Sequence, residues 1–377
     1  MKIAIYHPWL KAKGGAERVI LELVQRLKRH HCIIFTNFYL PHKTFPEFRN
    51  LDVKVVGPKI PFFGFLARGG LFGLAIGLTK LPNLKSFDVL IISTSGIGEF
   101  IVFRNNLIPT ICYCHTPLRA AHDFFNYYKN RSLLFKLAVL IYRFFESIAW
   151  SKFDLILCNS KTVYERIMRA KLANPRCIKI VNPGVDIFKF KPSKTSQNYF
   201  LAPGRIIAYK RFELAIEAFS EFNKIKKNFS LVIAGHPEDK TYLARLQKLA
   251  ASTPNIKFIL SPSDKELIEL YQKCYAVLFT AKNEDWGLIP LEAMACGKPV
   301  IAVNEGGPLE SVINNKTGLL VRAKPESIAN AMLKLTSVPN LAKKMGLAAR
   351  THALAFDWKR FAAKLEFAIL EVKNAKR

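Results

Sequence analysis

Short apolar runs alternate with helical patterns along most of the chain. Runs that predict buried strands occupy residues 2–7, 32–36, 53–56, 89–93, 110–114, 155–159, 179–181, 199–203, 231–234, 256–259, 276–280 and 299–303. Between the first two runs, the apolar residues from Ala16 to Leu27 recur with the spacing of one helical face. Such alternation is typical of an α/β protein whose parallel sheets are covered by helices on both faces. We therefore predict an α/β fold built on parallel sheets.

The length of 377 residues suits two domains. The segment Asn182-Pro183-Gly184-Val185-Asp186 breaks the strand pattern sharply, and the polar stretch 189–198 that follows it is typical of a linker. We predict a first domain over residues 1–185 and a second over 186–355. An amphipathic helical pattern then covers residues 356–373.

Residues 283–311 hold the densest group of candidate functional side chains. A polar turn with Glu284 leads to Gly287, after which a helical pattern carries Glu292 and ends at Gly297. A strand follows, and Glu305-Gly306-Gly307-Pro308 then opens a second helix, where paired glycines allow backbone to approach a ligand. Helix N-termini attract anions, so two of them predict an anionic ligand. The alternative is an ordinary strand–helix–strand unit with exposed acids.

Other candidates follow predicted strands, where the ligands of parallel sheets gather. Gly14 and Gly15 separate the first strand from its helix and leave room for a phosphate or a sugar. His115 stands just past a strand end and is followed by Thr-Pro, so we interpret it as facing a ligand rather than as a structural histidine.

Two basic residues flank the loop after strand 199–203. Arg205 and Lys210 are placed there to hold a diphosphate, although solvent-exposed surface cations are the alternative. Gly235 ends the next strand, at a position suited to lining a nucleobase pocket.

The stretch 283–311 resembles the donor-sugar motif of the retaining glycosyltransferases of family 4, in which a Glu, seven residues and a second Glu precede a small-residue helix. The resemblance implies that Glu284 contacts donor-sugar hydroxyls, that Glu292 contacts the nucleotide ribose, and that Gly287 and Leu288 donate backbone N–H groups. Trp286 stands where the family more often has Phe. The fold implied is GT-B, with two Rossmann-like domains facing each other across a cleft and helix 356–377 packing back on the first domain.

The resemblance extends to both predicted domains. It implies that Gly14 and Gly15 line the region where donor and acceptor meet, and that Arg205 and Lys210 hold the donor diphosphate. The sequence around His115 is similar to that of the mannosyltransferase-like branch, which implies contact with the transferred sugar near its reacting carbon. Arg119 and Asp123 become candidates for the acceptor side. His122 departs from the branch, which usually has Trp there.

His115, Arg205, Lys210 and Glu284 are therefore the predicted catalytic residues. The donor-binding set is Gly14, Gly15, Arg205, Lys210, Gly235, Glu284, Gly287, Leu288 and Glu292. Cationic side chains that neutralise a departing diphosphate would make a divalent metal unnecessary, and no Asp-x-Asp pair stands at a predicted strand end of the first domain. We predict no cofactor beyond the nucleotide-sugar substrate.

The charge balance of 57 Lys and Arg against 28 Asp and Glu, net +29, predicts anionic partners. The basic clusters are scattered and no nucleic-acid module accompanies them, so an anionic membrane surface is favoured over nucleic acid. A generally basic proteome is the alternative. The apolar runs 60–81 and 132–150 are interrupted by charges, so neither predicts a spanning helix; the second, flanked by Lys129, Arg131 and Lys152, predicts a core or membrane-lying helix.

Seven cysteines without paired metal spacing predict reduced, buried thiols, and Cys112-Tyr113-Cys114-His115 lacks the further ligands of a zinc site. No signal peptide precedes the first strand. These features predict a cytoplasmic protein, peripheral on the cytoplasmic face of the cell membrane.

The resemblance favours transfer of mannose from GDP-mannose to a lipid-linked or polysaccharide glycan. A UDP-hexose donor is the alternative within the class. Outside it, a non-catalytic basic membrane-binding protein and a sugar-nucleotide epimerase on the same scaffold remain as rivals. An epimerase would turn over without an acceptor, whereas a transferase would need one.

Overall fold

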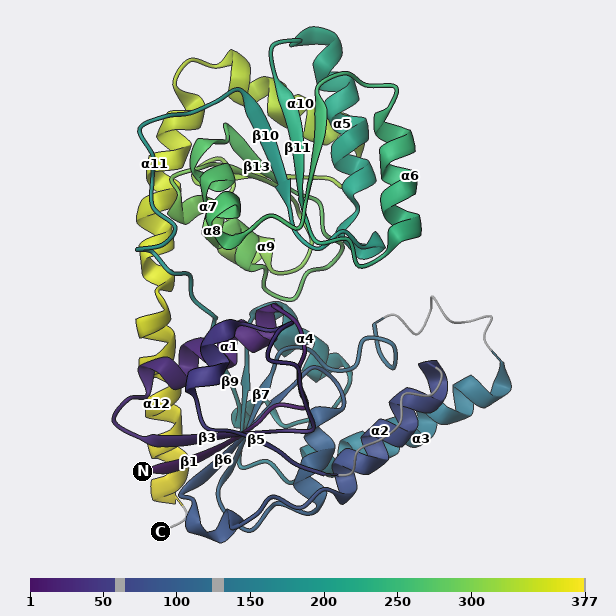
Figure 1. The fold of residues 1–377 in the computed structure, drawn as a ribbon, viewed down its shortest axis with the longest axis vertical. Helices are drawn as coiled ribbons and strands as arrows, with labels where there is room; N and C mark the ends of the chain where they lie inside the picture. The colour runs from purple at the N-terminus through teal and green to yellow at the C-terminus, as the bar shows by residue number, and fades with distance from the viewer. Residues whose placement is uncertain (58–64, 124–131, 376–377) are drawn as a thin grey trace. The chain divides into compact units, whose positions relative to one another are not determined.

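A computed structural model describes residues 1–57, 65–123 and 132–375. The chain forms two compact units, one made of Met1–Asn182 with Phe361–Arg377 and the other of Pro183–Arg360. The sequence predicts these divisions at residues 185/186 and 355/356, within a few residues of the observed ones. Each unit is an α/β domain with its own sheet and core (Figure 1).

The sheet of unit 1 has seven parallel strands in the order β5-β3-β1-β6-β7-β8-β9. The bounds are β1 Lys2–Tyr6, β3 His31–Thr36, β5 Val53–Val55, β6 Val89–Thr94, β7 Thr110–Cys114, β8 Leu155–Cys158 and β9 Ile178–Ile180. A short pair, β2 (Trp9–Leu10) and β4 (Phe38–Tyr39), lies outside this sheet. The apolar side chains of β1 and β6 are fully buried, as expected for strands covered on both faces.

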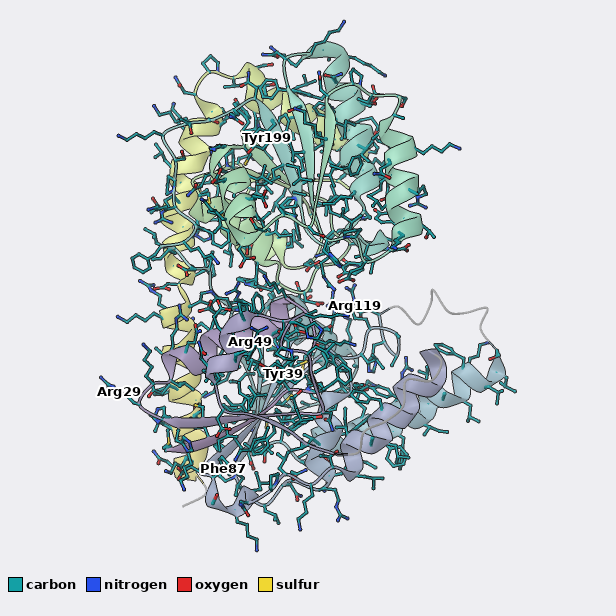
Figure 2. The ribbon with its side chains drawn as sticks, in the orientation of Figure 1. Arg29, Tyr39, Arg49, Phe87, Arg119 and Tyr199 are labelled. Carbon is teal, nitrogen blue, oxygen red and sulfur yellow. The ribbon has the colours of Figure 1, made fainter. Side chains whose placement is uncertain are left out.

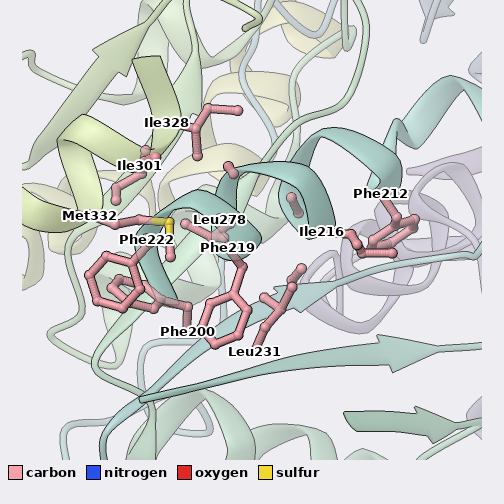
Figure 3. Packing of buried hydrophobic residues seen from close by; sticks show 14 of the residues in the cluster. Phe200, Phe212, Ile216, Phe219, Phe222, Leu231, Leu278, Ile301, Ile328 and Met332 are labelled. Carbon is pink, nitrogen blue, oxygen red and sulfur yellow. The ribbon is translucent and has the colours of Figure 1, made fainter. Parts of the chain in front are cut away.

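The sheet of unit 2 has six parallel strands in the order β12-β11-β10-β13-β14-β15. The bounds are β10 Tyr199–Pro203, β11 Ser230–Gly235, β12 Ile256–Leu260, β13 Ala276–Phe279, β14 Val300–Val303 and β15 Gly318–Val321. Alternate residues of β10 enter two separate cores: Phe200 packs with Phe219 and Phe222 on one face (Figure 3), and Leu201 packs on the other. This two-sided burial explains why the strands are apolar runs rather than alternating patterns.

Helices cover both sheets. Those of unit 1 are α1 Gly15–Arg26, α2 Phe65–Leu78, α3 Leu133–Trp150 and α4 Lys161–Arg169, and α12 Trp358–Ala375 belongs to this unit from Phe361 onward. Those of unit 2 are α5 Phe212–Ile225, α6 Lys240–Ala250, α7 Asp264–Lys273, α8 Leu288–Ala295, α9 Pro308–Ser311, α10 Pro325–Ser337 and α11 Leu341–Ala353. None of the helices in the described part of the chain has the length and apolar content to cross a bilayer.

Both sheets share one topology. If the strands of each sheet are numbered along the chain, the order begins 3-2-1-4-5-6 in each case. In such sheets the direction of strand addition reverses between the first and fourth strands, and ligands bind beyond the carboxyl ends at that switch point. The switch points lie between β1 and β6 in unit 1 and between β10 and β13 in unit 2.

Several local predictions are confirmed and others need adjustment. Gly297 has a φ of +70° just after α8, and Pro308 is the first residue of α9, as predicted. Strand β15 was absent from the predicted set, and α9 has only four residues. Residues 60–64 of the apolar run 60–81, and the flanking Lys129 and Arg131, lie outside the described residues.

The cysteines are free thiols. Five of the seven are buried, Cys32 is half-buried and Cys177 is exposed, so the prediction of buried thiols holds for most of them. Burial raises the pKa of the Cys274 thiol to about 12, which keeps it protonated and unreactive at neutral pH.

Candidate active site

The loop after β10 places Lys210 beside Glu284, at the switch point of unit 2. Lys210 ends the 3-10 helix Ala208–Lys210 (η6), and its backbone oxygen accepts a hydrogen bond from Thr280 Oγ1 at 2.8 Å. The Lys210 Nζ lies 2.7 Å from Glu284 Oε2, and the two side chains are 9% and 21% exposed. A largely buried ion pair at the carboxyl edge of a parallel sheet is well placed to meet a charged, hydroxyl-bearing ligand.

Arg205 lies in the same loop and contacts Tyr209, which is not among the predicted site residues. Its guanidinium donates to Glu238 Oε1 at 2.9 Å and to the Tyr209 hydroxyl at 2.5 Å. The Tyr209 ring centroid lies 6.0 Å from Arg205 Cζ and 5.3 Å from Lys210 Nζ. One aromatic ring therefore contacts both predicted phosphate-binding cations. Its position between them in the sequence was the available signal.

Arg211 and Glu305 brace the turn that carries Glu284. Arg211 has a φ of 52°, its Nε donates to Thr280 O at 2.8 Å, and its guanidinium pairs with Glu305 Oε2 at 2.9 Å. The same carboxylate accepts from the backbone N–H of Asn283 at 3.3 Å. These bonds connect the end of β13, the turn and the loop after β14. Sequence reasoning missed the role of Arg211 because its partners are far away in the chain.

The paired glycines Gly306 and Gly307 have a packing reason to be glycine, and the approach of a ligand to their backbone remains a prediction. A Cβ at Gly306 would overlap the backbone of Glu284, and one at Gly307 would overlap that of Trp286. Gly307 also donates its N–H to Glu284 O at 2.8 Å. The four-residue α9 that follows is too short to provide the second predicted anion site.

The start of α8 retains the predicted arrangement. Gly287 is the N-terminal flanking residue with a φ of +84°, Leu288 is the first helical residue, and no side chain caps this end among the described residues. Further along, Glu292 Oε2 accepts a hydrogen bond from the buried Tyr271 hydroxyl at 2.7 Å. Burial, reinforced by Glu292, raises the pKa of Tyr271 well above its usual value, so this phenol remains a donor.

Trp286 is buried and forms a contact that a phenylalanine could not form. Its indole Nε1 donates to Pro183 O at 3.1 Å. Pro183 is the first residue of unit 2, and the adjacent Gly184 packs so tightly against residues 356–358 that a Cβ would overlap them. The turn carrying Glu284 is thereby hydrogen-bonded to the segment where the chain enters unit 2.

Gly235 has a structural reason to be glycine. It ends β11, and a Cβ there would overlap the backbone oxygen of Gly204, the residue after β10. Gly204 in turn donates its N–H to Ala234 O at 2.9 Å. Close packing of two strand ends therefore accounts for this glycine, and its contact with a nucleobase remains a prediction.

In unit 1 the switch point holds a chain of three polar side chains. His7 follows β1, Ser93 lies near the end of β6, and His115 follows β7. The Ser93 Oγ lies 2.9 Å from His7 Nδ1 and 2.8 Å from His115 Nε2. The backbone of His115 is fixed as well, because its N–H donates to Thr94 O and its oxygen accepts from Asn159 Nδ2, both at 2.9 Å.

His7 and His115 are both neutral at physiological pH. Burial lowers the pKa of His115 to about 3, with a further contribution from His7, and lowers the pKa of His7 to about 4. His7 Nε2 is buried and has no hydrogen-bond partner among the described residues. His115 can therefore accept or donate a single hydrogen bond to a sugar hydroxyl without adding positive charge.

The two glycines before α1 differ in their surroundings. Gly14 flanks the N-terminus of the helix, and a Cβ there would overlap the carboxylate of Glu17. Gly15 is the first helical residue, and no heavy atom lies within 4 Å of where its Cβ would be. The described structure gives no packing reason for glycine at this second position.

The predicted acceptor residues lie in the segment after β7. Arg119 is partly buried within unit 1 (Figure 2). Asp123 Oδ2 pairs with Arg166 Nε at 2.5 Å, and the same guanidinium donates to Thr116 Oγ1 at 3.2 Å. His122, where the resemblance expects Trp, lies 2.7 Å from the buried Glu146. The structure thus ties this segment to α3 and α4, and the acceptor roles remain predictions.

Two family models together match most of the chain. The model described as "Glycosyltransferase Family 4" matches residues 13–188, and that described as "Glycosyl transferases group 1" matches residues 185–352. Lys210, Glu284 and Glu292 lie within the second match, and His115 lies within the first. The first match ends and the second begins close to the division between the two units at residues 182/183.

Full-length relatives agree with these matches. The chain is 30% identical to the alpha-1,3/1,6-mannosyltransferase ALG2 of Mus musculus, over 89% of this chain and 88% of that protein. It is 28% identical to ALG2 of Dictyostelium discoideum, over 97% of each protein.

Solved structures support the fold. Anabaena Alr3699/HepE in complex with UDP and glucose superposes with a TM-score of 0.77 at 18% identity, covering 98% of this chain and 100% of that one. The lipopolysaccharide glycosyltransferase WaaG superposes with a TM-score of 0.73 at 17% identity, covering 97% and 99%. The chain therefore belongs to glycosyltransferase family 4, has the GT-B fold and is a glycosyltransferase.

Proposed function

We propose that this enzyme transfers mannose from GDP-mannose, with retention of configuration, to a lipid-linked or polysaccharide glycan. The observation that carries the proposal is the Lys210–Glu284 ion pair at the switch point of unit 2, next to Arg205. Mannose is favoured as the transferred sugar because the relatives that match almost the whole chain bear the name alpha-1,3/1,6-mannosyltransferase.

The difficult step in glycosyl transfer is the departure of the nucleoside diphosphate. Negative charge grows on the leaving phosphate while positive charge grows on the sugar ring, so fixed cations at the phosphate lower the barrier. Arg205 and Lys210 are the cations proposed for this role. Tyr209 and Thr280 hold their loop in place, so little reorganisation is needed when the bond breaks.

The sugar and the ribose are proposed to be held by carboxylates. Glu284 accepts hydrogen bonds from hydroxyls of the transferred sugar, and Glu292, oriented by Tyr271, accepts from the ribose. His115 is proposed to contact the sugar as a neutral imidazole, because burial lowers its pKa. A neutral group near the reacting carbon does not oppose the positive charge that develops there.

The proposed donor site relies on cationic side chains rather than on a metal ion. Arg205 and Lys210 supply the positive charge that a divalent cation supplies in other transferases. Turnover is therefore expected to persist when divalent ions are chelated. Loss of activity in EDTA, restored by one added divalent cation, would overturn this part of the proposal.

The acceptor is proposed to be embedded in the membrane, with the enzyme peripheral on its cytoplasmic face. A lipid-linked glycan presents its sugar near a bilayer surface, and the net charge of +29 favours contact with an anionic leaflet. Arg119 and Asp123 remain the candidates for contacting the acceptor glycan.

The experiment incubates the purified full chain with GDP-mannose, UDP-glucose, UDP-galactose or UDP-N-acetylglucosamine, each with and without a membrane lipid extract. Release of GDP or UDP and transfer of labelled sugar are measured together. We expect acceptor-dependent release of GDP from GDP-mannose. Lys210→Gln should lower this rate by about 100-fold, whereas Lys224→Gln should not, since Lys224 is exposed and pairs with the neighbouring Glu221.

Each other outcome identifies a rival. Preference for a UDP-sugar would show that the donor is a UDP-hexose rather than GDP-mannose. Conversion of the nucleotide sugar without acceptor would favour an epimerase. Absence of turnover with every donor and extract, from protein that binds anionic vesicles, would favour a non-catalytic membrane-binding protein.

A further inference from the structure

Helix α3 exposes an apolar stripe along most of its length. Its members recur at spacings of three and four residues and are between 47% and 82% exposed: Leu133, Leu134, Leu137, Leu140, Ile141, Phe144 and Phe145. A surface helix of a globular protein normally turns such a stripe toward the core. In unit 1 the stripe faces away from the core.

The inward face of α3 combines the buried apolar residues Val139, Ala149 and Trp150 with a group of hydrogen-bonded polar side chains. The Tyr142 hydroxyl lies 2.9 Å from Glu99 Oε1 and 3.0 Å from Glu146 Oε1. Glu146 is completely buried and lies 2.7 Å from His122 Nε2, and Arg143 Nε donates to Ala121 O at 2.8 Å. Rotating the helix to bury its apolar stripe would leave these buried groups without partners, which is strongly unfavourable. The exposure of the stripe is therefore set by the fold.

Other exposed apolar residues belong to the same part of unit 1. Helices α2 and α3 both pack against the 3-10 helix Gly98–Phe103 (η3), where the Phe103 ring contacts Phe145 and lies under Gly77 of α2. On α2, Leu74 is 60% and Leu78 is 63% exposed. Contiguous exposed apolar surface of this kind marks an interaction site.

The exposed charged residues in the chain segments near the stripe are mostly basic. Exposed basic residues in this part of the chain are Lys80, Lys85, Arg104 and Lys136. The acids among the described residues 72–123 and 132–152 are Asp88, Glu99, Asp123 and Glu146. Of these, Glu99 and Glu146 are buried, Asp88 pairs with Lys373 at 2.7 Å, and Asp123 pairs with Arg166. An exposed apolar stripe in a part of the chain whose exposed charges are mostly basic matches the headgroup region of an anionic bilayer.

We propose that the outer face of α3 is the surface by which this enzyme docks on a membrane containing anionic lipid, with the helix lying in the plane of the headgroups. The apolar side chains enter the acyl boundary, and the surrounding lysines and arginines contact lipid phosphates. Helix α3 carries Lys136, Arg143 and Glu146, which suits a helix lying on a bilayer better than one crossing it. The inference deepens the proposed function by naming the surface that meets the lipid of the acceptor.

The test uses lipid alone, without donor or acceptor, so its failure is distinguishable from failure of the proposed reaction. Purified full chain is mixed with vesicles of phosphatidylcholine, or of an equimolar mixture with phosphatidylglycerol, and the bound fraction is measured by flotation. We expect binding to the mixed vesicles that weakens with added salt. The double variant Leu140→Gln/Phe144→Gln should bind about tenfold or more weakly, given the apolar area removed.

Phe188→Gln is the matched control, because Phe188 is an 81% exposed aromatic residue of unit 2. It should bind vesicles like the unmodified chain. Thermal unfolding and circular dichroism of the double variant should be unchanged, because both side chains are largely exposed.

Two results would overturn the proposal. One is equal vesicle binding by the unmodified chain and the double variant. The other is a lipid-free dimer, seen by analytical ultracentrifugation, that the double variant dissociates while vesicles bind neither protein. That second result would assign the stripe to another copy of the chain.

Discussion

Lys210 Nζ lies 2.7 Å from Glu284 Oε2, although 74 residues separate the two in the sequence. The pair joins the residue predicted to bind the donor phosphates, Lys210, to the residue predicted to bind the donor sugar, Glu284. In the proposed site, donor binding redistributes this contact, because the phosphates compete for the lysine and the sugar hydroxyls compete for the carboxylate. The two residues therefore act as one unit, and their substitutions are not expected to be additive.

Substitution of either partner separates their roles. Lys210→Gln and Glu284→Gln should each lower turnover by about 100-fold, and the double variant should lose less than the product of the two effects. Binding of GDP alone, measured by calorimetry, should weaken in Lys210→Gln and change little in Glu284→Gln, because GDP lacks the sugar. Equal weakening of GDP binding in both variants would contradict the separate roles assigned to Lys210 and Glu284.

Tyr271→Phe tests how Glu292 is held. Removing the hydroxyl deletes the bond to Glu292 Oε2 and should raise the KM for the donor by about tenfold, with a smaller effect on kcat and a loss of about 1 kcal/mol of stability. Tyr199→Phe is the control: its hydroxyl donates to Leu270 O of the same helix α7, away from Glu292. If both variants change KM alike, the effect comes from α7 as a whole rather than from Glu292.

Gly15→Ala tests for a ligand near the backbone at the start of α1. Because no heavy atom lies within 4 Å of the added Cβ, the fold should be retained or made slightly more stable. Turnover should nevertheless fall about tenfold or more if donor or acceptor approaches that backbone closely, as the family resemblance implies. Gly77→Ala, whose Cβ would meet only ordinary contacts, provides the comparison. Full activity in Gly15→Ala would remove Gly15 from the site.

Ser93 is expected to position His115. Ser93→Ala removes the hydroxyl shared by His7 and His115 and should lower kcat about tenfold, with little change in KM. Combining it with His115→Ala should cost no more than His115→Ala alone, since Ser93 acts through that imidazole. Ser93→Thr, which keeps the hydroxyl, should restore most of the rate. Additive losses would show that Ser93 acts independently of His115.

Glu99 gives stability a pH dependence of known sign. Burial, together with Glu146, raises the pKa of Glu99 from 4.5 to about 7. Between those values the unfolded chain releases a proton that the folded chain retains, so this contribution to stability is complete below pH 4.5 and is lost as pH rises to about 7. Relative to the unmodified chain, Glu99→Gln should therefore gain stability across that window as pH rises.

The two histidines act in the opposite direction, because their lowered pKa values destabilise the fold as pH falls below 6.5. They are present in both proteins and cancel in the comparison. Urea unfolding at a series of pH values checks the difference, with the exposed Glu221→Gln as control. A pH-independent difference for Glu99→Gln would contradict the assigned shift.

The sheets and the glycine positions around α8 could be predicted from the sequence. Strands buried on both faces are apolar runs, and turns with positive φ favour glycine. Gly287 and Gly297 fall into this class, with φ of +84° and +70°. Strand β15 was not predicted because its four residues are too few to show a clear hydrophobic pattern. Its pairing with β14 determines its conformation. The braces formed by Arg211 and Tyr271 depend on segments distant in sequence, so local patterns could not reveal them.

The orientation of α3 was likewise beyond the sequence. Periodicity shows that residues 133–150 have two faces, but not which face is buried. Tyr142, Arg143 and Glu146 face inward because Glu99, Ala121 and His122 supply partners for them. The choice between a core helix and a membrane-lying helix depended on those tertiary partners.

The indole of Trp286 has a consequence for how firmly the turn that carries Glu284 is held. Phenylalanine is apolar enough for this buried position, but it is smaller and has no N–H to donate to the carbonyl of Pro183. The turn that carries Glu284 is consequently hydrogen-bonded to Pro183, the first residue of unit 2. Trp286→Phe would remove this bond and leave the turn that carries Glu284 less firmly held to the segment where the chain enters unit 2.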